Sequence, residues 1–408
     1  MKKEFKDLKI CILGLGYIGL PTAAILTRAG FNVLGVDTND SVVNIIKKGE
    51  IHIKENGLKD LISRAVSKKL LKVSTKPAQS DIFIICVPTP LQINNNKLPK
   101  PDISYVLNAI DSITPFIKKG DLIILESTCP VGTSNIIAKK LQENSNIDFS
   151  ELNVAYCPER VLPGNILFEL TNNDRVIGGI NSRSSKLAEA FYRSFCKGKL
   201  FITSTKTAEM VKLTENSYRD LNIAFANQLS IICDEIGIDA NELISLSNHH
   251  PRVNILQPGC GVGGHCIAID PWFITSSFPD NSSLIRTARE VNLHKETWVL
   301  NKIMDYVEKI RGKLKKEIKI GCYGISFKPN VDDTRESPAL KIVLELLSNN
   351  FDVVVCDPNI KNIDLFDLVS LDEIYHSVDI HILLVSHSEF YQLDFLNKNV
   401  LDFCGLVN

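Results

Sequence analysis

The sequence predicts an α/β protein with two doubly wound parallel-sheet domains joined by a connector of long helices. Three observations support this prediction: short apolar runs alternate with helical patterns near both ends, a helical block separates them, and a glycine-rich turn follows the first run. The 408 residues also exceed the roughly 250–300 that one core supports. We therefore expect three domains, at residues 1–203, 204–311 and 312–408.

The first part contains six short apolar runs that we interpret as strands. Continuous runs bounded by Gly or Pro are typical of parallel strands that are covered on both faces. The helical patterns between them supply the crossovers that a parallel sheet needs. The predicted strands lie at residues 10–13, 33–36, 82–87, 122–125, 154–156 and 175–178.

The middle of the chain is helical, and the last hundred residues return to strands. Residues 206–236 form a long helical pattern without Pro or Gly, followed by two more at 241–247 and 284–310. Long helices with apolar faces often form a dimer seam, so we expect a homodimer or a higher homo-oligomer. After a lysine-rich stretch at 311–319, further strands are predicted at 318–323, 353–356 and 380–385.

Composition and charge exclude several classes of protein. The 46 basic and 47 acidic side chains leave a formal charge of −1, so no net field favours nucleic acid or a membrane surface, and we expect neither partner. No stretch approaches the 18 or so apolar residues of a membrane span, and glycines interrupt the first apolar run, unlike a signal peptide. The 11 cysteines lack a CxxC pair, which indicates reduced thiols and a cytoplasmic location.

A dinucleotide site is predicted where the first strand meets its helix. The strand leads into GLGYIG, which has the GxGxxG spacing of a Rossmann-like turn. The next strand ends in Asp37, whose carboxylate can hold two ribose hydroxyls and would repel a 2′-phosphate, so NAD is favoured over NADP. We expect the pyrophosphate to lie against Gly14, Gly16, Tyr17, Ile18 and Gly19.

Hydroxyl side chains follow two other predicted strands. Thr89 and Thr128 come after the runs at 82–87 and 122–125, at the carboxyl edge where ligands of open α/β sheets bind. We interpret both as cofactor-binding residues. Ordinary turn chemistry is the alternative explanation for each.

Residues with catalytic chemistry occur in the middle part. Lys212, Asn216 and Arg219 are spaced to share one face of the long helix, although a solvated polar face would have the same spacing. The glycine-dense stretch GCGVGGHCIAIDP then places Cys266 four residues before Asp270. Glycines allow close approach of the backbone to a ligand, and a cysteine beside a cation can be a thiolate nucleophile.

A metal site is the competing interpretation of this region. Its possible ligands are His249, His250, Cys260, His265 and Cys266. They lack the paired C-x₂₋₄-C and H-x₃₋₅-H spacing of a zinc site, so we predict no metal.

Several long motifs carry a resemblance to a known family. In chain order they include YCPERVLPG, EMVKLTEN, HPRVN, GCGVGGHCIAIDP and YGISFKPNVDDTRESP. With them, nearly the whole chain resembles the UDP-glucose/GDP-mannose dehydrogenase family. The resemblance implies an N-terminal NAD domain, a helical dimer connector and a C-terminal nucleotide-sugar domain. It also implies that two NAD⁺ molecules oxidise the C6 alcohol of a nucleotide sugar to a carboxylate.

The resemblance also implies a substrate. Three sequence motifs are most similar to those of family members that act on UDP-N-acetyl-D-mannosamine: RDLNIAFANQLS, HHPRVNILQPG and HCIAIDPWFI. Few contacts distinguish the UDP-hexoses, so UDP-N-acetylglucosamine, UDP-N-acetylgalactosamine and UDP-glucose remain alternatives. Two other classes also remain open: a two-electron NAD dehydrogenase that needs no thiol, and a non-catalytic protein that binds NAD or a nucleotide sugar.

This resemblance, together with the chemistry of the side chains, implies a role for each catalytic residue. Glu159 is the predicted base of the first oxidation, either directly or through a water. Cys266 then adds to the aldehyde, and a second hydride transfer converts the thiohemiacetal to a thioester that water hydrolyses. Lys212 and Asn216 are predicted to contact the substrate and stabilise its oxyanion, with Asp270 orienting Lys212 or activating the water.

Cations along the chain are assigned to the substrate and the cofactor. We expect some arginines of the HPRVN loop to reach the substrate site from the partner subunit. Arg335 resembles a residue that closes over the NAD pyrophosphate, and surface salt bridges are the alternative for all these charges. Val42 stands where some relatives have an Arg for the adenine side. The predicted substrate residues are Arg160, Arg219, Arg252 and Lys328 for the diphosphate, and Val161, His250 and Gly263 near the sugar or uridine.

Overall fold

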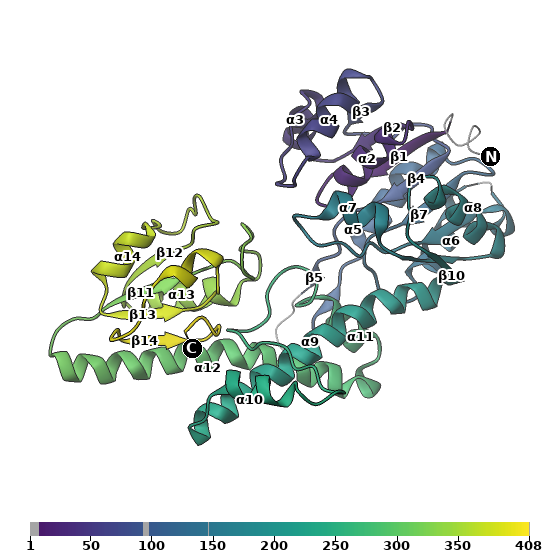
Figure 1. Ribbon diagram of the computed structural model, residues 1–408. Helices are drawn as coiled ribbons and strands as arrows, with labels where there is room; N and C mark the ends of the chain where they lie inside the picture. Colours follow the sequence, from purple (N-terminus) through teal and green to yellow (C-terminus); the bar gives the residue numbers. More distant parts are fainter. Residues whose placement is uncertain (1–7, 93–97, 146, 408) are drawn as a thin grey trace. The chain divides into compact units, whose positions relative to one another are not determined.

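A computed structural model describes residues 8–92, 98–145 and 147–407. The chain divides into two compact units, Met1–Thr214 and Glu215–Asn408. Helix α9 (Thr205–Ile236) begins in the first unit and continues into the second. Figure 1 labels many of the elements of each unit.

An eight-stranded sheet forms the framework of the first unit. Its strand order is β10-β9-β8-β7-β4-β1-β2-β3. From β1 the chain adds strands towards one edge of the sheet and from β4 towards the other, so the switch point of a doubly wound fold lies between β1 and β4. The strands are β1 (Lys9–Leu13), β2 (Asn32–Val36), β3 (Leu71–Ser74), β4 (Ile82–Ile85), β7 (Leu122–Leu125), β8 (Asn153–Tyr156), β9 (Arg175–Gly179) and β10 (Leu200–Ser204). A separate two-stranded hairpin pairs β5 (Leu91–Gln92) with β6 (Lys100–Pro101).

Helices cover both faces of this sheet because successive strand residues point to opposite sides. Ile10 and Ile12 of β1 pack with α2, α4 and α8, whereas Cys11 and Leu13 pack with α5 and α6. The central strands β1, β4, β7 and β8 are therefore buried on both faces, as the predicted runs indicated. The helices of this unit are α2 (Gly19–Arg28), α3 (Asp40–Lys47), α4 (Leu58–Ser67), α5 (Ser104–Ile113), α6 (Thr133–Asn144), α7 (Ile166–Asn172) and α8 (Ser182–Arg193).

The second unit contains long helices and a smaller sheet. The sheet has the order β12-β11-β13-β14, all parallel, with α12 and α13 packed on one face and α14 on the other. Its strands are β11 (Lys319–Tyr323), β12 (Asp352–Cys356), β13 (Ile380–Leu383) and β14 (Val400–Asp402). The helices other than α9 are α10 (Ala240–Ser247), α11 (Asp270–Ser277), α12 (Ser283–Leu314), α13 (Pro338–Ser348) and α14 (Leu371–Ser377).

The predicted fold class is confirmed, with three differences in detail. Strand β9 pairs antiparallel to β8, so the first sheet is not wholly parallel. Strands β3, β10 and β14 of the two sheets were not predicted, nor was the pair β5 and β6. Helix α12 runs to Leu314, four residues past the predicted end and into the lysine-rich stretch.

Short 3₁₀ turns occupy Thr114–Phe116, Phe149–Glu151, Pro279–Asn281 and Ser388–Gln392. Among the helices of the described residues, none is long and apolar enough to cross a membrane.

Candidate active site

The glycine turn after β1 has the geometry of a dinucleotide site. Gly14 has φ +88°, and a Cβ there would lie 2.5 Å from the carbonyl oxygen of Cys86. A Cβ at Gly19 would lie 1.8 Å from the carbonyl oxygen of Gly14, so close packing requires both glycines. At Gly16 a Cβ would meet no atom within 4 Å. The protein's own packing does not require Gly16, which leaves that space for a pyrophosphate beside the start of α2.

Asp37 holds a fixed carboxylate beside this turn. It follows β2 directly, and its Oδ2 accepts a hydrogen bond from the Leu15 amide at 2.9 Å. Its Oδ1 accepts one from the Asn39 amide, also at 2.9 Å. Each carboxylate oxygen keeps further acceptor capacity, which suits the two hydroxyls of an adenosine ribose. These residues fit NAD.

Two predicted threonines connect neighbouring loops at the same edge of the sheet. The Thr89 hydroxyl, after β4, donates to the carbonyl oxygen of Thr128, after β7, at 2.7 Å. Ser127 reinforces the connection by donating to the carbonyl oxygen of Val87 at 2.7 Å. A hydrogen bond between the two turns therefore uses the hydroxyl hydrogen of Thr89, while its oxygen can still accept a hydrogen bond from a ligand.

Lys212 and Glu159 form a buried pair in the first unit. Lys212 Nζ lies 2.9 Å from Glu159 Oε1 and 2.8 Å from the Glu159 carbonyl oxygen, and its side chain is only 7% exposed. The Val161 amide donates to the other carboxylate oxygen of Glu159 at 2.9 Å. Burial alone would raise the pKa of Glu159, but Lys212 and the Val161 amide hold that pKa below its usual value. Glu159 is therefore ionised at neutral pH.

Glu209 anchors the first turns of α9, a role that the sequence did not reveal. Its buried carboxylate accepts hydrogen bonds from the Gly132 amide at 2.6 Å and from the Ser134 amide and hydroxyl at 2.8 and 2.7 Å. These groups lie at the start of α6, where acceptors are favoured. Because Glu209 precedes Lys212 by three residues, the anchor fixes the turn from which Lys212 extends.

Asn216 and Asp270 form the corresponding contact in the second unit. Asn216 Nδ2 donates to Asp270 Oδ2 at 2.6 Å, and both side chains are buried. Asp270 is the first residue of α11, and its amide donates to the carbonyl oxygen of Cys266 at 2.8 Å. The contact therefore fixes the end of the Cys266 segment.

The two cysteines of this segment differ in their surroundings. Cys260 is buried, and burial raises the pKa of its thiol to about 12, which disfavours a thiolate. Its Sγ lies 3.4 Å from the carbonyl oxygen of Leu384, within the core. Cys266 is only partly buried. Of these two thiols, Cys266 is the one that a substrate can reach.

The glycines around Cys266 pack against the protein itself. A Cβ at Gly263 would lie 2.6 Å from the carbonyl oxygen of Glu336, and one at Gly264 would lie 3.0 Å from the Phe327 ring. The Gly264 amide also donates to the carbonyl oxygen of Arg335 at 3.0 Å. Packing against the 324–338 loop therefore requires these glycines, whereas the sequence suggested close approach to a ligand.

The polar face of α9 differs from the predicted one. Lys212 and Asn216 are buried, which excludes a solvated face for them. Arg219 is exposed, and the buried stripe continues through Asp220. Arg219 therefore falls at the border of the buried stripe, and its contact with the substrate stays a prediction.

The remaining predicted cations differ in exposure: Arg252 and Arg335 are exposed, whereas Arg160 and Lys328 are partly buried. Arg160 donates to the carbonyl oxygen of Asp174 at 3.4 Å. His250 and Arg252 are exposed in the segment after α10, and the Arg252 amide donates to His250 Nδ1 at 3.3 Å. Lys328 Nζ lies 5.6 Å from the centre of the Phe327 ring. Arg335 forms a two-pronged pair with Asp333, with Arg335 Nη2 2.6 Å from Asp333 Oδ2.

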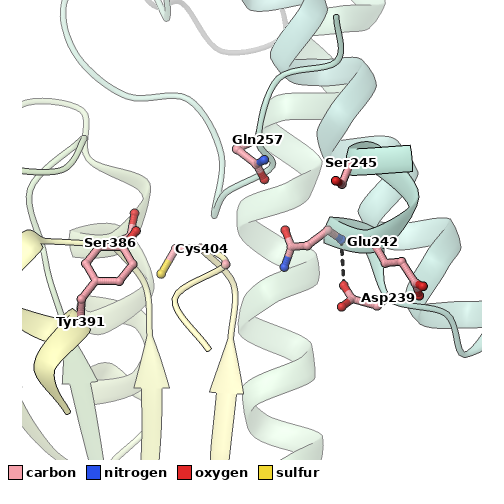
Figure 2. Close-up of a pocket in the computed structure, with 9 residues that line it drawn as sticks. Asp239, Glu242, Ser245, Gln257, Ser386, Tyr391 and Cys404 are labelled. Carbon is pink, nitrogen blue, oxygen red and sulfur yellow. Dashed lines mark hydrogen bonds between the residues drawn. The ribbon is translucent and has the colours of Figure 1, made fainter. Parts of the chain in front are cut away.

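The second unit also contains a pocket of about 590 Å³ between α10 and the segments after β13 and β14 (Figure 2). None of the predicted substrate residues lines it. Its walls combine two carboxylates, two amides and a phenol with the partly buried Cys404. The lining residues are Asp239, Asn241, Glu242, Ser245, Gln257, Ser386, Tyr391, Cys404 and Gly405.

The histidines and cysteines considered as metal ligands do not form a site in the structure. Across residues 8–92, 98–145 and 147–407, no three His, Cys, Asp or Glu side chains are grouped so that they could hold a metal ion. His265 is exposed, whereas Cys260 is in the core.

Comparison with known proteins gives matches along the whole chain. Models of the UDP-glucose/GDP-mannose dehydrogenase family match in three parts: the NAD binding domain at residues 8–196, the central domain at 206–294 and the UDP binding domain at 321–405. A UDP-N-acetyl-D-mannosamine dehydrogenase of Campylobacter jejuni is 48% identical, over 97% of this chain and 99% of its own length.

Two further relatives bear on the fold and the substrate. The solved structure of a UDP-D-ManNAc dehydrogenase from Pyrococcus horikoshii has a TM-score of 0.90 and 37% identity, covering 98% of this chain and 96% of that one. An NDP-N-acetyl-D-galactosaminuronic acid dehydrogenase of Ralstonia nicotianae is 46% identical, over 94% of this chain and 92% of its own length. The similarity therefore extends to relatives named for different N-acetylated sugars.

Proposed function

Because this chain belongs to the UDP-glucose/GDP-mannose dehydrogenase family, whose NAD binding domain it contains, we propose that it oxidises UDP-N-acetyl-D-mannosamine. The product is UDP-N-acetyl-D-mannosaminuronate, formed by a four-electron oxidation at C6. Relatives named UDP-N-acetyl-D-mannosamine dehydrogenase match over nearly the full length, which favours this sugar over the other UDP-hexoses. Bound NAD⁺ supplies the hydride acceptor for each of the two oxidations.

The first oxidation needs a base for the C6 hydroxyl proton. We assign this step to Glu159, which is ionised because Lys212 and the Val161 amide stabilise its carboxylate. The C6 hydroxyl proton passes to this carboxylate directly or through a water that it orients. As the hydroxyl proton and the C6 hydride leave, the alcohol becomes an aldehyde.

The second oxidation needs a nucleophile, which we assign to Cys266. Its sulfur adds to the aldehyde carbon, and the carbonyl oxygen becomes the oxyanion of a thiohemiacetal. The Lys212 ammonium and the Asn216 amide stabilise this oxyanion by charge and hydrogen bonding. Loss of hydride gives a thioester, and water then attacks its carbonyl carbon, breaking the C–S bond to yield the carboxylate and the free thiol. Asp270, fixed by Asn216, activates that water.

The burial of Lys212 with Glu159 supports this chemistry most directly. Charged residues on a helix normally face water, and burying an ion pair costs desolvation free energy. A protein that only bound the nucleotide sugar would not need this buried pair. A two-electron dehydrogenase could use the same pair. Only the role of Cys266 separates the two enzymes.

Other features extend the proposal to the whole protein. We assign residues 1–203 to NAD binding, 204–311 to the connector and 312–408 to nucleotide-sugar binding. Arg160, Arg252 and Lys328 hold the diphosphate, with Arg219 at the border of the buried face of α9. An exposed apolar stripe on α9 supports a homodimer, and eleven cysteines without a CxxC pair support a reducing, cytoplasmic location.

Initial rates with four sugars test the substrate. The purified protein is given NAD⁺ and UDP-N-acetylmannosamine, UDP-N-acetylglucosamine, UDP-N-acetylgalactosamine or UDP-glucose, and the uronate is identified by mass spectrometry. We expect kcat/KM for UDP-N-acetylmannosamine to exceed the others by at least about tenfold, the size of effect that a few sugar contacts produce. A higher value for another sugar would overturn the substrate and leave the chemistry intact.

A further inference from the structure

The segment that carries Cys266 is attached to α9 at both of its ends. At the start, the Gly259 amide donates to Asn227 Oδ1 at 2.9 Å. At the end, Asp270 Oδ2 accepts from Asn216 Nδ2 at 2.6 Å. Asn216 and Asn227 lie eleven residues apart on α9, which is about three turns, so both side chains leave the same face of the helix.

A second buried amide fixes the orientation of Asn227. Asn227 Nδ2 donates to Asn292 Oδ1 at 2.9 Å, and Asn292 Nδ2 donates to Asp220 Oδ1 and to the Asp220 carbonyl oxygen at 2.8 and 3.1 Å. Both amides are completely buried. Because Asn292 binds the NH₂ group of Asn227, the Asn227 carbonyl oxygen must face Gly259.

This network ends in an ion pair that contributes little to stability. Arg289 Nη1 donates to Asp220 Oδ1 at 2.5 Å, with both side chains almost fully buried. Among the described residues, Ser217 Oγ, Asp220 Oδ2 and Arg289 Nε have no hydrogen-bond partner. A buried pair with incomplete hydrogen bonding loses in desolvation much of what it gains in attraction, so it fixes geometry more than it stabilises the fold.

We propose that Asn227 and Asn292 are positioning residues that, together with Asn216, clamp the Cys266 segment along α9 and so hold the thiol in place for the second oxidation. The proposal rests on the nucleophilic role assigned to Cys266. Asn227 and Asn292 act through the backbone of the segment, in which Gly259 is seven residues before Cys266.

Asn227→Leu tests the clamp, because leucine has a similar volume but neither accepts from Gly259 nor donates to Asn292. Ser230→Ala is the matched control. Ser230, three residues further along α9, accepts from the largely buried Lys295 of α12 at 2.8 Å and donates to the Asn227 backbone carbonyl oxygen at 2.7 Å. Its loss therefore removes an α9–α12 polar contact but leaves both side-chain bonds of Asn227 in place. If the leucine variant does not fold, Asn227→Ala leaves space for a water and tests the same bonds.

Hydrogen exchange of residues 259–269 measures the clamp without any reaction. We expect about tenfold faster exchange in Asn227→Leu than in the wild type and no change in Ser230→Ala, because one buried hydrogen bond is lost. Asn227→Asp keeps an acceptor for Gly259 and should restore most of the protection. Equal exchange in Asn227→Leu and Ser230→Ala would overturn the clamp.

Kinetics measure its consequence for the second oxidation. We expect kcat of Asn227→Leu to fall about tenfold with KM for the UDP-sugar within twofold, since a displaced thiol leaves binding intact. With hydroxylamine as an aldehyde trap, NADH formed per sugar should fall from two toward one in Asn227→Leu only. A fall in kcat that Ser230→Ala reproduces would contradict positioning. If the wild type oxidises no UDP-sugar, the proposed function fails, while hydrogen exchange still decides the clamp.

Discussion

At the residue scale, Asp37 decides the affinity for NAD. Asp37→Ser removes the carboxylate that the Leu15 and Asn39 amides hold in place, and with it the charged acceptor for the ribose hydroxyls. Hydrogen bonds to a charged group contribute roughly 1.5–3 kcal/mol, so the Kd for NAD⁺ should rise about 10- to 100-fold. Titration calorimetry measures this, with the exposed Asp40→Ser as control. An unchanged Kd for Asp37→Ser would place the ribose elsewhere.

Lys212 couples catalysis to the ionisation of Glu159. Lys212→Met should lower kcat about 10²- to 10³-fold, because it removes charge from the developing oxyanion. It should also lower Tm, because burial then dominates and raises the pKa of Glu159.

The pH dependence of this Tm loss has a defined sign. In the wild type the pKa of Glu159 is below its usual value of 4.5, so its stabilising contribution is complete above that value and disappears as pH falls through the lower pKa. The Tm difference between wild type and Lys212→Met should therefore be largest near pH 7 and shrink below about pH 4. Adding Glu159→Gln to Lys212→Met should recover Tm at pH 7. A difference that is constant from pH 7 to 4 would contradict the ion pair.

At the scale of elements, the contact between α9 and α12 predicts a second pH effect. Lys295 is almost fully buried, donates to Ser230 and lies 3.8 Å from the centre of the Trp298 ring. Burial lowers the pKa of Lys295 from 10.5 to about 8. Between pH 8 and 10.5 the unfolded chain therefore binds more protons than the native one, so stability rises with pH there.

Lys295→Met should consequently raise Tm at pH 7, because methionine can pack on Trp298 without a buried charge. The gain should shrink as pH rises toward 10, since the wild-type lysine is then neutral when folded. Differential scanning calorimetry at pH 7 and 10 makes the comparison. A Tm difference that is the same at both pH values would mean that Lys295 does not titrate near 8.

The sequence predicted the elements whose pattern is strong and missed those whose pattern is weak. The six predicted strands of the first domain are continuous apolar runs, which local composition reveals. Strand β10, at the sheet edge, is largely exposed and was missed, because an edge strand needs no second apolar face. The antiparallel pairing of β8 with β9 depends on the path of the chain, which local pattern does not encode.

The candidate site shows the same limit. The glycine turn, Asp37 and the Lys212–Asn216 spacing depend on local chemistry and were predictable. The buried stripe of α9 passes through Asp220 because Arg289 and Asn292 of α12 lie against it, about seventy residues away in the sequence. Spacing along one helix favoured Arg219, the neighbour of Asp220. Only the long-range contact identifies which one is buried.

At the scale of the whole molecule, an apolar stripe on α9 predicts self-association. Tyr218, Phe225, Ile232 and Ile236 recur at intervals of seven, seven and four residues and are 68%, 52%, 45% and 63% exposed. Such a stripe suits the same helix of a second copy. Sedimentation velocity should show a dimer for the wild type and a monomer for Phe225→Glu, whereas Leu396→Glu, at a site that is 76% exposed and lies outside α9, should remain a dimer. A dimer that persists in Phe225→Glu would place the interface on another surface.

The number of NADH molecules formed per sugar tests the central claim, which is a four-electron oxidation through Cys266. The wild-type protein is given limiting UDP-N-acetylmannosamine and excess NAD⁺, and Cys266→Ser is followed in parallel. We predict two NADH per sugar for the wild type, and for Cys266→Ser at most one, with the aldehyde recoverable as its hydroxylamine adduct. One NADH per sugar from the wild type, or two from Cys266→Ser at an undiminished rate, would contradict the thioester route.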